Sequence, residues 1–184
     1  MSITPGYRRR RRLGAVLAAS VLLVLLRHGS PGAQEVTAPA LKAAFLFNFV
    51  KFTTWPSEVL PDEAPVMLCV VNAPSVAREL TGAVKGRVVA GHPLRVEQPA
   101  VGNGLNDCHL LYVSGARAIA VAALDAVRNA PVLTVSDLQA FGAEGGIVQL
   151  HVQQGQLRFA VALDAVRAAR LQVSSRLLAL SREP

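Results

Sequence analysis

The chain has 184 residues, of which 52% are hydrophobic and 17% charged. This composition is typical of one folded domain and excludes intrinsic disorder as the main state. The formal net charge of +7 comes from the N-terminus, because residues 1–33 hold six arginines and no acid, while the rest has 13 basic and 12 acidic residues. A nearly neutral body lacks the basic face that nucleic-acid binding requires, so no nucleic-acid partner is expected.

Residues 1–33 have the pattern of an export signal. The arginines Arg8 to Arg12 precede a 14-residue apolar run, Leu13 to Leu26, which is followed by small and turn-forming residues. We expect cleavage after Gly32 or Ala33 and leave open whether export uses the twin-arginine route. The alternative is an uncleaved membrane anchor, although a bilayer span needs about 20 residues. The mature protein is therefore predicted to lie outside the cytoplasm.

The two cysteines, Cys69 and Cys108, both lie in the mature body. An even pair of cysteines in an exported protein favours one disulfide. The alternative that remains open is a pair of buried free thiols.

An aromatic helix is predicted to follow the signal, from Pro39 to the Trp55-Pro56 pair that ends it. Four residues recur at helical spacing and predict its buried face: Leu41, Phe45, Phe49 and Phe52. Phe47 lies off this face and is available to contact a partner.

Strand and helix patterns then alternate along the chain. Buried strands are predicted over 66–71, 109–113 and 131–135, weaker strands over 88–89 and 94–96, and a hairpin over 147–152 and 157–163. In the first hairpin strand Ile147, Gln149 and His151 should face one way, and Val148, Leu150 and Val152 the other. Helices are predicted over 74–80, 116–128, 164–171 and 174–180, the last two with Asp164 and Ser174 as N-caps.

This order predicts an α/β fold: a single three-layer domain with a mainly parallel sheet, an antiparallel hairpin at one edge and helices on both faces. The sequence contains no nucleophile elbow, phosphate-binding loop or zinc-protease motif. The twelve carboxylates are spread singly through helices and turns, and Asp137 is interpreted as a helix cap after the third strand. Adjacent Cys108 and His109 would point to opposite faces of a strand, which does not suit a shared metal. We therefore predict no catalytic residue, metal or cofactor, and no enzyme.

Seven segments, in this order, resemble the periplasmic YfiR-like family across about residues 38–181. They are KAAFLFNFVKFTTWP, VMLCVV, NDCHLLYVS, PVLTVSD, FGAEGGIVQL, LRFAVALDAVRAARL and VSSRLLAL. The resemblance implies a periplasmic protein that represses an inner-membrane diguanylate cyclase by binding its periplasmic domain. Such a protein would hold down cyclic-di-GMP synthesis and biofilm formation.

The resemblance also carries over to particular residues. Cys69 and Cys108 match one disulfide pair of the family, whereas a second pair is absent because Ala143 and Glu144 stand in that region. Gly145 and Gly146 match a glycine pair ahead of a strand, where the backbone turns tightly or approaches a neighbour closely.

The predicted function is regulatory binding to a membrane signalling protein, with a homodimer also possible. Candidate contact residues are Phe47, Trp55, Leu177 and Leu178. The alternative is a periplasmic small-molecule-binding protein, with its ligand in the crevice at the carboxyl ends of the parallel strands.

Overall fold

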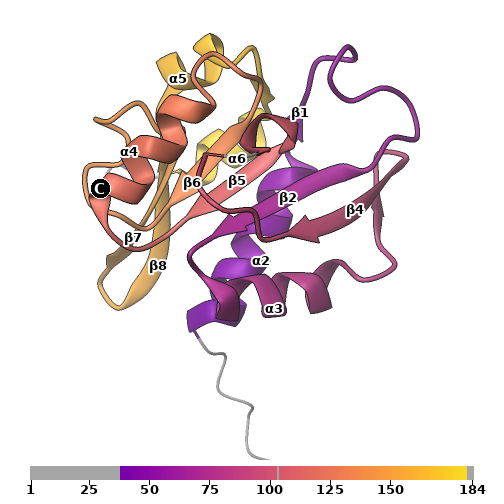
Figure 1. Cartoon of the computed structure of the whole chain (residues 1–184). Helices are drawn as coiled ribbons and strands as arrows, with labels where there is room; N and C mark the ends of the chain where they lie inside the picture. Colours follow the sequence, from indigo (N-terminus) through magenta and orange to yellow (C-terminus); the bar gives the residue numbers. More distant parts are fainter. Residues whose placement is uncertain (1–37, 103, 182–184) are drawn as a thin grey trace, which may run out of the picture. The chain divides into compact units, whose positions relative to one another are not determined.

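A computed structural model describes residues 38–102 and 104–181 of the chain (Figure 1). The predicted export signal, residues 1–33, lies outside the described residues. None of the helices in the described part is long and apolar enough to cross a bilayer.

The described chain is organised around a seven-stranded sheet with the order β3-β4-β2-β5-β6-β7-β8. Neighbours from β4 to β7 are parallel, and the pairs β3–β4 and β7–β8 are antiparallel. The strands are β2 (Val66–Val71), β3 (Val88–Val89), β4 (His92–Glu97), β5 (Leu110–Val113), β6 (Leu133–Ser136), β7 (Val148–Gln153) and β8 (Gln156–Val161). The predicted α/β class and edge hairpin are confirmed. The structure also shows that the other edge of the sheet is antiparallel, because β3 pairs antiparallel with β4.

Among the described residues, five helices accompany this sheet, together with one short 3₁₀ helix and a separate two-stranded pair. The helices are α2 (Ala38–Lys51), α3 (Pro74–Val84), α4 (Arg117–Ala126), α5 (Leu163–Ala168) and α6 (Ser175–Leu180), with η1 at Leu105–Asp107. The pair consists of β1 (Thr53–Thr54) and β9 (Gln172–Val173), which are antiparallel.

Two hydrophobic clusters place helices on both faces of the sheet. One cluster joins Leu68, Leu110 and Leu133 of the strands to buried residues of α2, α3, α5 and α6. The other joins Val71 and Leu111 to buried residues of α4 and η1. The central strands are nearly continuous apolar runs because they are covered on both faces.

The aromatic helix differs from its prediction. Helix α2 ends at Lys51 rather than near Trp55, because Thr53 and Thr54 pair with β9. Its buried residues are Ala43, Leu46, Phe49 and Val50, whereas Leu41 is 37% exposed and Phe45 and Phe52 are half-buried. The aromatic rings flank the buried face and meet β8, where the centroids of Phe49 and Phe159 lie 5.1 Å apart.

Helix ends and the hairpin bring further corrections. Ser174 caps α6, since its Oγ accepts from the Leu177 amide at 3.3 Å, but Asp164 lies inside the first turn of α5 and caps nothing. Helix α3 continues past the predicted end at residue 80 because Val84 still reaches the core. In the hairpin, both predicted faces are buried near its base, and Val152 is 73% exposed near the tip.

Candidate functional site

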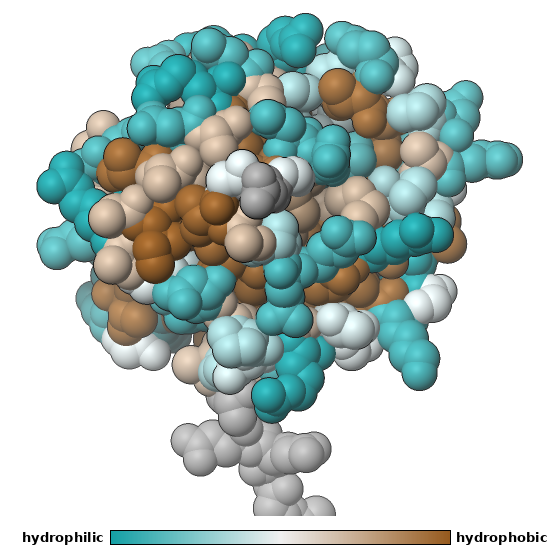
Figure 2. Space-filling model, viewed as in Figure 1, coloured by the Kyte–Doolittle hydropathy of each residue, from teal (hydrophilic) through white to brown (hydrophobic). Residues whose placement is uncertain are grey.

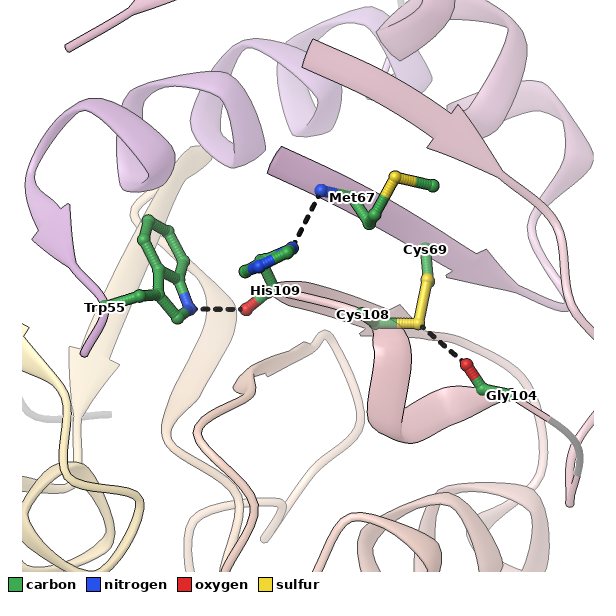
Figure 3. The surroundings of a disulfide bond; sticks show 6 residues. All are labelled: Trp55, Met67, Cys69, Gly104, Cys108 and His109. Carbon is green, nitrogen blue, oxygen red and sulfur yellow. Dashed lines mark hydrogen bonds between the residues drawn. A yellow bond between two sulfur atoms is a disulfide. The ribbon is translucent and has the colours of Figure 1, made fainter. Parts of the chain in front are cut away.

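The two cysteines form a disulfide on the face of the sheet covered by α4 (Figure 3). Cys69 lies in β2, and Cys108 lies between η1 and β5, with the two Cα atoms 5.8 Å apart. Both are 3% exposed, and the Cys108 sulfur lies 3.7 Å from the Gly104 carbonyl oxygen. This confirms the predicted bridge and removes the free-thiol alternative.

Next to the bridge, backbone contacts hold the His109 side chain on both ring nitrogens. The Met67 amide donates to Nδ1 at 3.0 Å, so the proton lies on Nε2, which donates to the Val59 carbonyl at 3.1 Å. The Trp55 indole donates to the His109 carbonyl at 3.0 Å (Figure 3). His109 is thus fixed as a neutral imidazole and serves as a structural link among three segments.

This arrangement makes stability depend on pH through His109. Burial lowers the pKa of the His109 imidazole below its usual value of 6.5. The hydrogen bond to the Val59 carbonyl raises this pKa in part, and the nearby charge of His92 lowers it further. The unfolded chain therefore binds this proton more readily than the folded chain does. The contribution of His109 to the free energy of unfolding is fully present above about pH 6.5, and it is lost as the pH drops towards the pKa of the folded state.

We expect the free energy of unfolding to fall as the pH drops below about 6.5, and His109→Asn to flatten this slope. An asparagine Oδ1 can still accept from Met67 but takes up no proton in this range. Urea denaturation of both proteins at each pH measures the slope, and an unchanged slope in the variant would assign it to other groups.

At the carboxyl edge of the sheet, polar side chains from three strand ends are linked to α2. Asp137, directly after β6, forms an ion pair with Lys42 of α2 and accepts from the Ser114 hydroxyl at 3.2 Å. The Asn72 side chain, after β2, donates to the Ser114 carbonyl at 3.1 Å. No helix follows β6, so the interpretation of Asp137 as a helix cap is wrong; its carboxylate instead anchors α2.

The electrostatics of this network keep Asp137 ionised. Partial burial opposes the charge, but the bond to the Lys42 ammonium and its charge outweigh this and hold the pKa of Asp137 below its usual value. Burial also raises the pKa of the Tyr112 phenol, and the nearby Asp137 carboxylate raises it further. The Tyr112 hydroxyl is fully buried with no hydrogen bond of standard geometry. It therefore stays protonated beside the carboxylate.

These contacts span the ends of β2, β5 and β6, where the crevice for a small molecule was predicted. A groove of about 500 Å³ lies instead between the C-terminal end of α4 and the start of α5, and a second groove of about 520 Å³ lies beside the β7–β8 hairpin. Both grooves lie away from the predicted crevice.

The glycine pair ahead of β7 has two different physical causes. Gly145 has a φ of +94°, which favours glycine. A Cβ on Gly146 would lie 2.2 Å from ring atoms of Phe141, a buried residue whose carbonyl accepts from the Gly146 amide at 3.0 Å. Gly145 and Gly146 therefore shape the turn, and neither contributes a binding group.

The structure divides the four candidate contact residues into two pairs. Trp55 is 7% exposed and Leu177 3% exposed, and both belong to the core, so they are corrected to structural residues. Phe47 and Leu178 are half-buried and reach the surface. This division depends on how α2, the segment after β1 and α6 pack onto the rest of the domain, which the sequence does not predict residue by residue.

Phe47 lies at the centre of a group that we call the cationic aromatic patch: Phe47, Lys51, Phe52 and Arg87. The Arg87 guanidinium carbon lies 5.2 Å from the centroid of the Phe47 ring, and the Lys51 ammonium lies 5.6 Å from it. Lys51 also lies 5.9 Å from the Phe52 centroid. Both cations are exposed, and within the described residues neither forms an ion pair.

The C-terminal helix begins beside this patch. The Ser174 amide donates to the Phe52 carbonyl at 2.9 Å, and β1 pairs with β9 just beyond. Helix α6, which carries Leu178 and the 63% exposed Leu180, therefore starts next to the end of α2. The two segments predicted to contain contact residues are brought together, although they are far apart in sequence.

Apolar side chains are also unevenly distributed at the surface. In Figure 2, which shows the face seen in Figure 1, hydrophobic residues gather towards the left and are bordered by hydrophilic ones. The large exposed hydrophobic side chains of the described domain are Leu41, Val88, Val152, Leu163 and Leu180. They come from different elements and do not by themselves define a site.

The mainly parallel sheet with antiparallel strands at both edges, and the buried disulfide, together define a small α/β domain. The chain belongs to the YfiR/HmsC-like family, whose model matches residues 39–182. This family is known for periplasmic regulators in cyclic-di-GMP signalling.

The fold also has a solved counterpart. The structure is similar to the crystal structure of a conserved domain protein from Vibrio cholerae O1 biovar El Tor strain N16961, with a TM-score of 0.53 and 12% sequence identity. The match covers 79% of this chain and 59% of that one. At this identity the likeness shows the fold alone. No curated protein matches the sequence.

Proposed function

We propose that this protein is a periplasmic regulator that represses an inner-membrane diguanylate cyclase, or a related signalling protein, by binding its periplasmic domain. Membership of the YfiR/HmsC-like family supports the regulatory role. The cationic aromatic patch is the observation that carries the binding mode, because it combines half-buried aromatic rings with exposed cations that pair with no acid among residues 38–102 and 104–181.

The chemistry of the patch indicates what the partner presents. Aromatic residues and arginine are the usual anchors of protein interfaces. Phe47 supplies apolar area, and Arg87 and Lys51 supply charge that a partner's carboxylates would pair with on docking. The partner surface is therefore acidic around an apolar centre, and α6 with Leu178 and Leu180 lies at the border of the contact.

Phe47→Ala and Arg87→Glu should each weaken binding to the partner's periplasmic domain by about 30-fold or more, the loss typical of a true anchor. The partner to use is the membrane signalling protein encoded beside this gene, and titration calorimetry measures the affinity. Arg128→Glu is the matched control, because it makes the same charge change on α4's face of the sheet, where Arg128 forms an exposed ion pair with Asp125.

Stability must be measured on the same samples. Phe47→Ala should lower the melting temperature much less than Trp55→Ala does, since the Phe47 ring packs against the core but is only half-buried. Full affinity in both patch variants would place the contact elsewhere, and an equal loss in Arg128→Glu would show only an effect of net charge. A large fall in melting temperature would assign Phe47 to the core.

A further inference from the structure

Residues 55–65, which join β1 to β2, are held to the sheet by two histidines, and we call this segment the strap. The Nε2 atom of His109 donates to the Val59 carbonyl at 3.1 Å. The Nδ1 atom of His92, in β4, donates to the Ala64 carbonyl at 2.8 Å. The strap forms turns and contains no helix or strand of its own. Its position therefore depends on these contacts and on its few buried side chains.

The His109 side chain cannot reach water unless the strap moves. Its backbone amide donates to the Met67 carbonyl at 2.9 Å, and its carbonyl accepts from the Leu133 amide at 2.8 Å, so β2 and β6 hold it from both sides. The disulfide fixes the preceding residue, Cys108. The Trp55 ring of the strap lies edge-on to the imidazole (Figure 3), and His109 is only 9% exposed.

A proton taken up by His109 would conflict with its present hydrogen bonds. In the neutral ring Nδ1 accepts from the Met67 amide at 3.0 Å, whereas a charged ring carries a hydrogen on both nitrogens. Nδ1 would then face one donor with another, and the charged ring is forced away from the Met67 amide. The bond from His92 to Ala64 survives, because its Nδ1 is the donor in either charge state.

We propose that the strap is a pH-sensitive switch: a proton taken up by His109 lifts residues 55–60 off the sheet, while His92 keeps the Ala64 end attached. The charged imidazole then gains water. The cost is the exposure of Trp55 and Leu60, which are buried in the closed strap.

The strap adjoins the cationic aromatic patch. Phe52 of the patch is joined to Trp55 by β1, which pairs with β9 ahead of α6. Movement of Trp55 therefore pulls on the strand beside the patch, and an open strap should weaken partner binding. This consequence rests on the proposed function, whereas the opening itself can be measured on the free protein.

The charge of His92 influences the pH at which the strap opens. It lowers the pKa of His109 in the same direction as burial, which has the larger effect. The other charged groups on the segments around His109 are exposed, where water and salt screen them: Glu58, Asp62, Glu63, Arg95 and Asp107. The opening should therefore have its midpoint below about pH 6.5, the usual pKa of histidine.

Trp55 is the single tryptophan of the chain, so its fluorescence reports on the strap directly. Between about pH 7.5 and about pH 5, its emission should shift to longer wavelength and acrylamide should quench it more strongly, while circular dichroism shows an unchanged fold. His109→Asn should abolish both changes. His92→Asn should move the midpoint to higher pH, because it removes the charge that lowers the pKa of His109. His151→Asn, in the hairpin, is the matched control and should leave the curve unchanged.

Constant emission and quenching in the folded wild-type protein across this range would overturn the switch. A midpoint that falls in His92→Asn would overturn the part assigned to His92. These measurements need no partner, so their outcome is independent of the proposed function.

Titration calorimetry with the partner's periplasmic domain tests the consequence for binding. The affinity of the wild type should be about fivefold or more weaker at the acidic end of the range, and that of His109→Asn nearly constant. An equal loss in both proteins would overturn the link between strap and patch. A strap that opens as expected in a protein that binds no partner at either pH would overturn the proposed function alone.

Discussion

Replacing Cys69 or Cys108 with serine lowers the free energy of unfolding by about 2–5 kcal/mol. The bridge joins residues separated by 39 positions, so its loss frees a long loop in the unfolded chain. Both sulfurs are also buried in the cluster beneath α4, where a serine hydroxyl costs free energy unless it finds a partner. Urea denaturation of each variant and of the wild type measures the difference.

Reduction of the wild-type protein is the matched control, because it breaks the bridge and leaves every other atom in place. Reduced protein and the double serine variant should lose stability together. Two free thiols per chain in unfolded, non-reduced protein would show that the bridge does not form. Equal stability in the oxidised and reduced forms would show that the bridge has no structural role.

Trp55→Ala should cost about 3–5 kcal/mol of stability, the range for removing a large buried aromatic side chain. The indole is 7% exposed, lies edge-on to the His109 ring with the centroids 6.0 Å apart, and donates to the His109 carbonyl. Its removal leaves a cavity where the segment after α2 meets the start of β5.

Trp55→Phe separates packing from hydrogen bonding at this position. Phenylalanine keeps most of the ring but loses the indole N–H, while the His109 carbonyl still accepts from the Leu133 amide at 2.8 Å. The cost should therefore be only about 0.5–1.5 kcal/mol. If Trp55→Ala instead weakened partner binding without loss of stability, Trp55 would be a surface anchor after all.

The positions of the central strands could be predicted because each of these strands carries its own signal. Runs such as Val66–Val71 are apolar at every position, which only a strand covered on both faces tolerates. The buried face of α2 could not be predicted as well, because seven of its fourteen residues are Ala, Leu or Val and its aromatic rings lie beside the buried stripe. Contact with Phe159, distant in sequence, decides which rings are covered.

The candidate site was predictable only where composition or one short segment indicated it. The cysteine pair followed from export and an even count, and the glycine pair from its position ahead of a strand. Lys42 and Asp137 are 95 positions apart and meet only after α2 packs on the sheet, so the ion pair left no local signal. Arg87 was not predicted as a contact residue for the same reason. It follows α3, and its guanidinium reaches the Phe47 ring only once α3 has packed against α2.

The level of cyclic-di-GMP in cells lacking this gene tests the regulatory role most directly. Deletion should raise it, the wild-type gene should restore it, and a stably folded Arg87→Glu variant should fail to do so while Arg128→Glu succeeds. An unchanged level after deletion, with a neighbouring diguanylate cyclase present and expressed, would contradict repression of a cyclase by this protein.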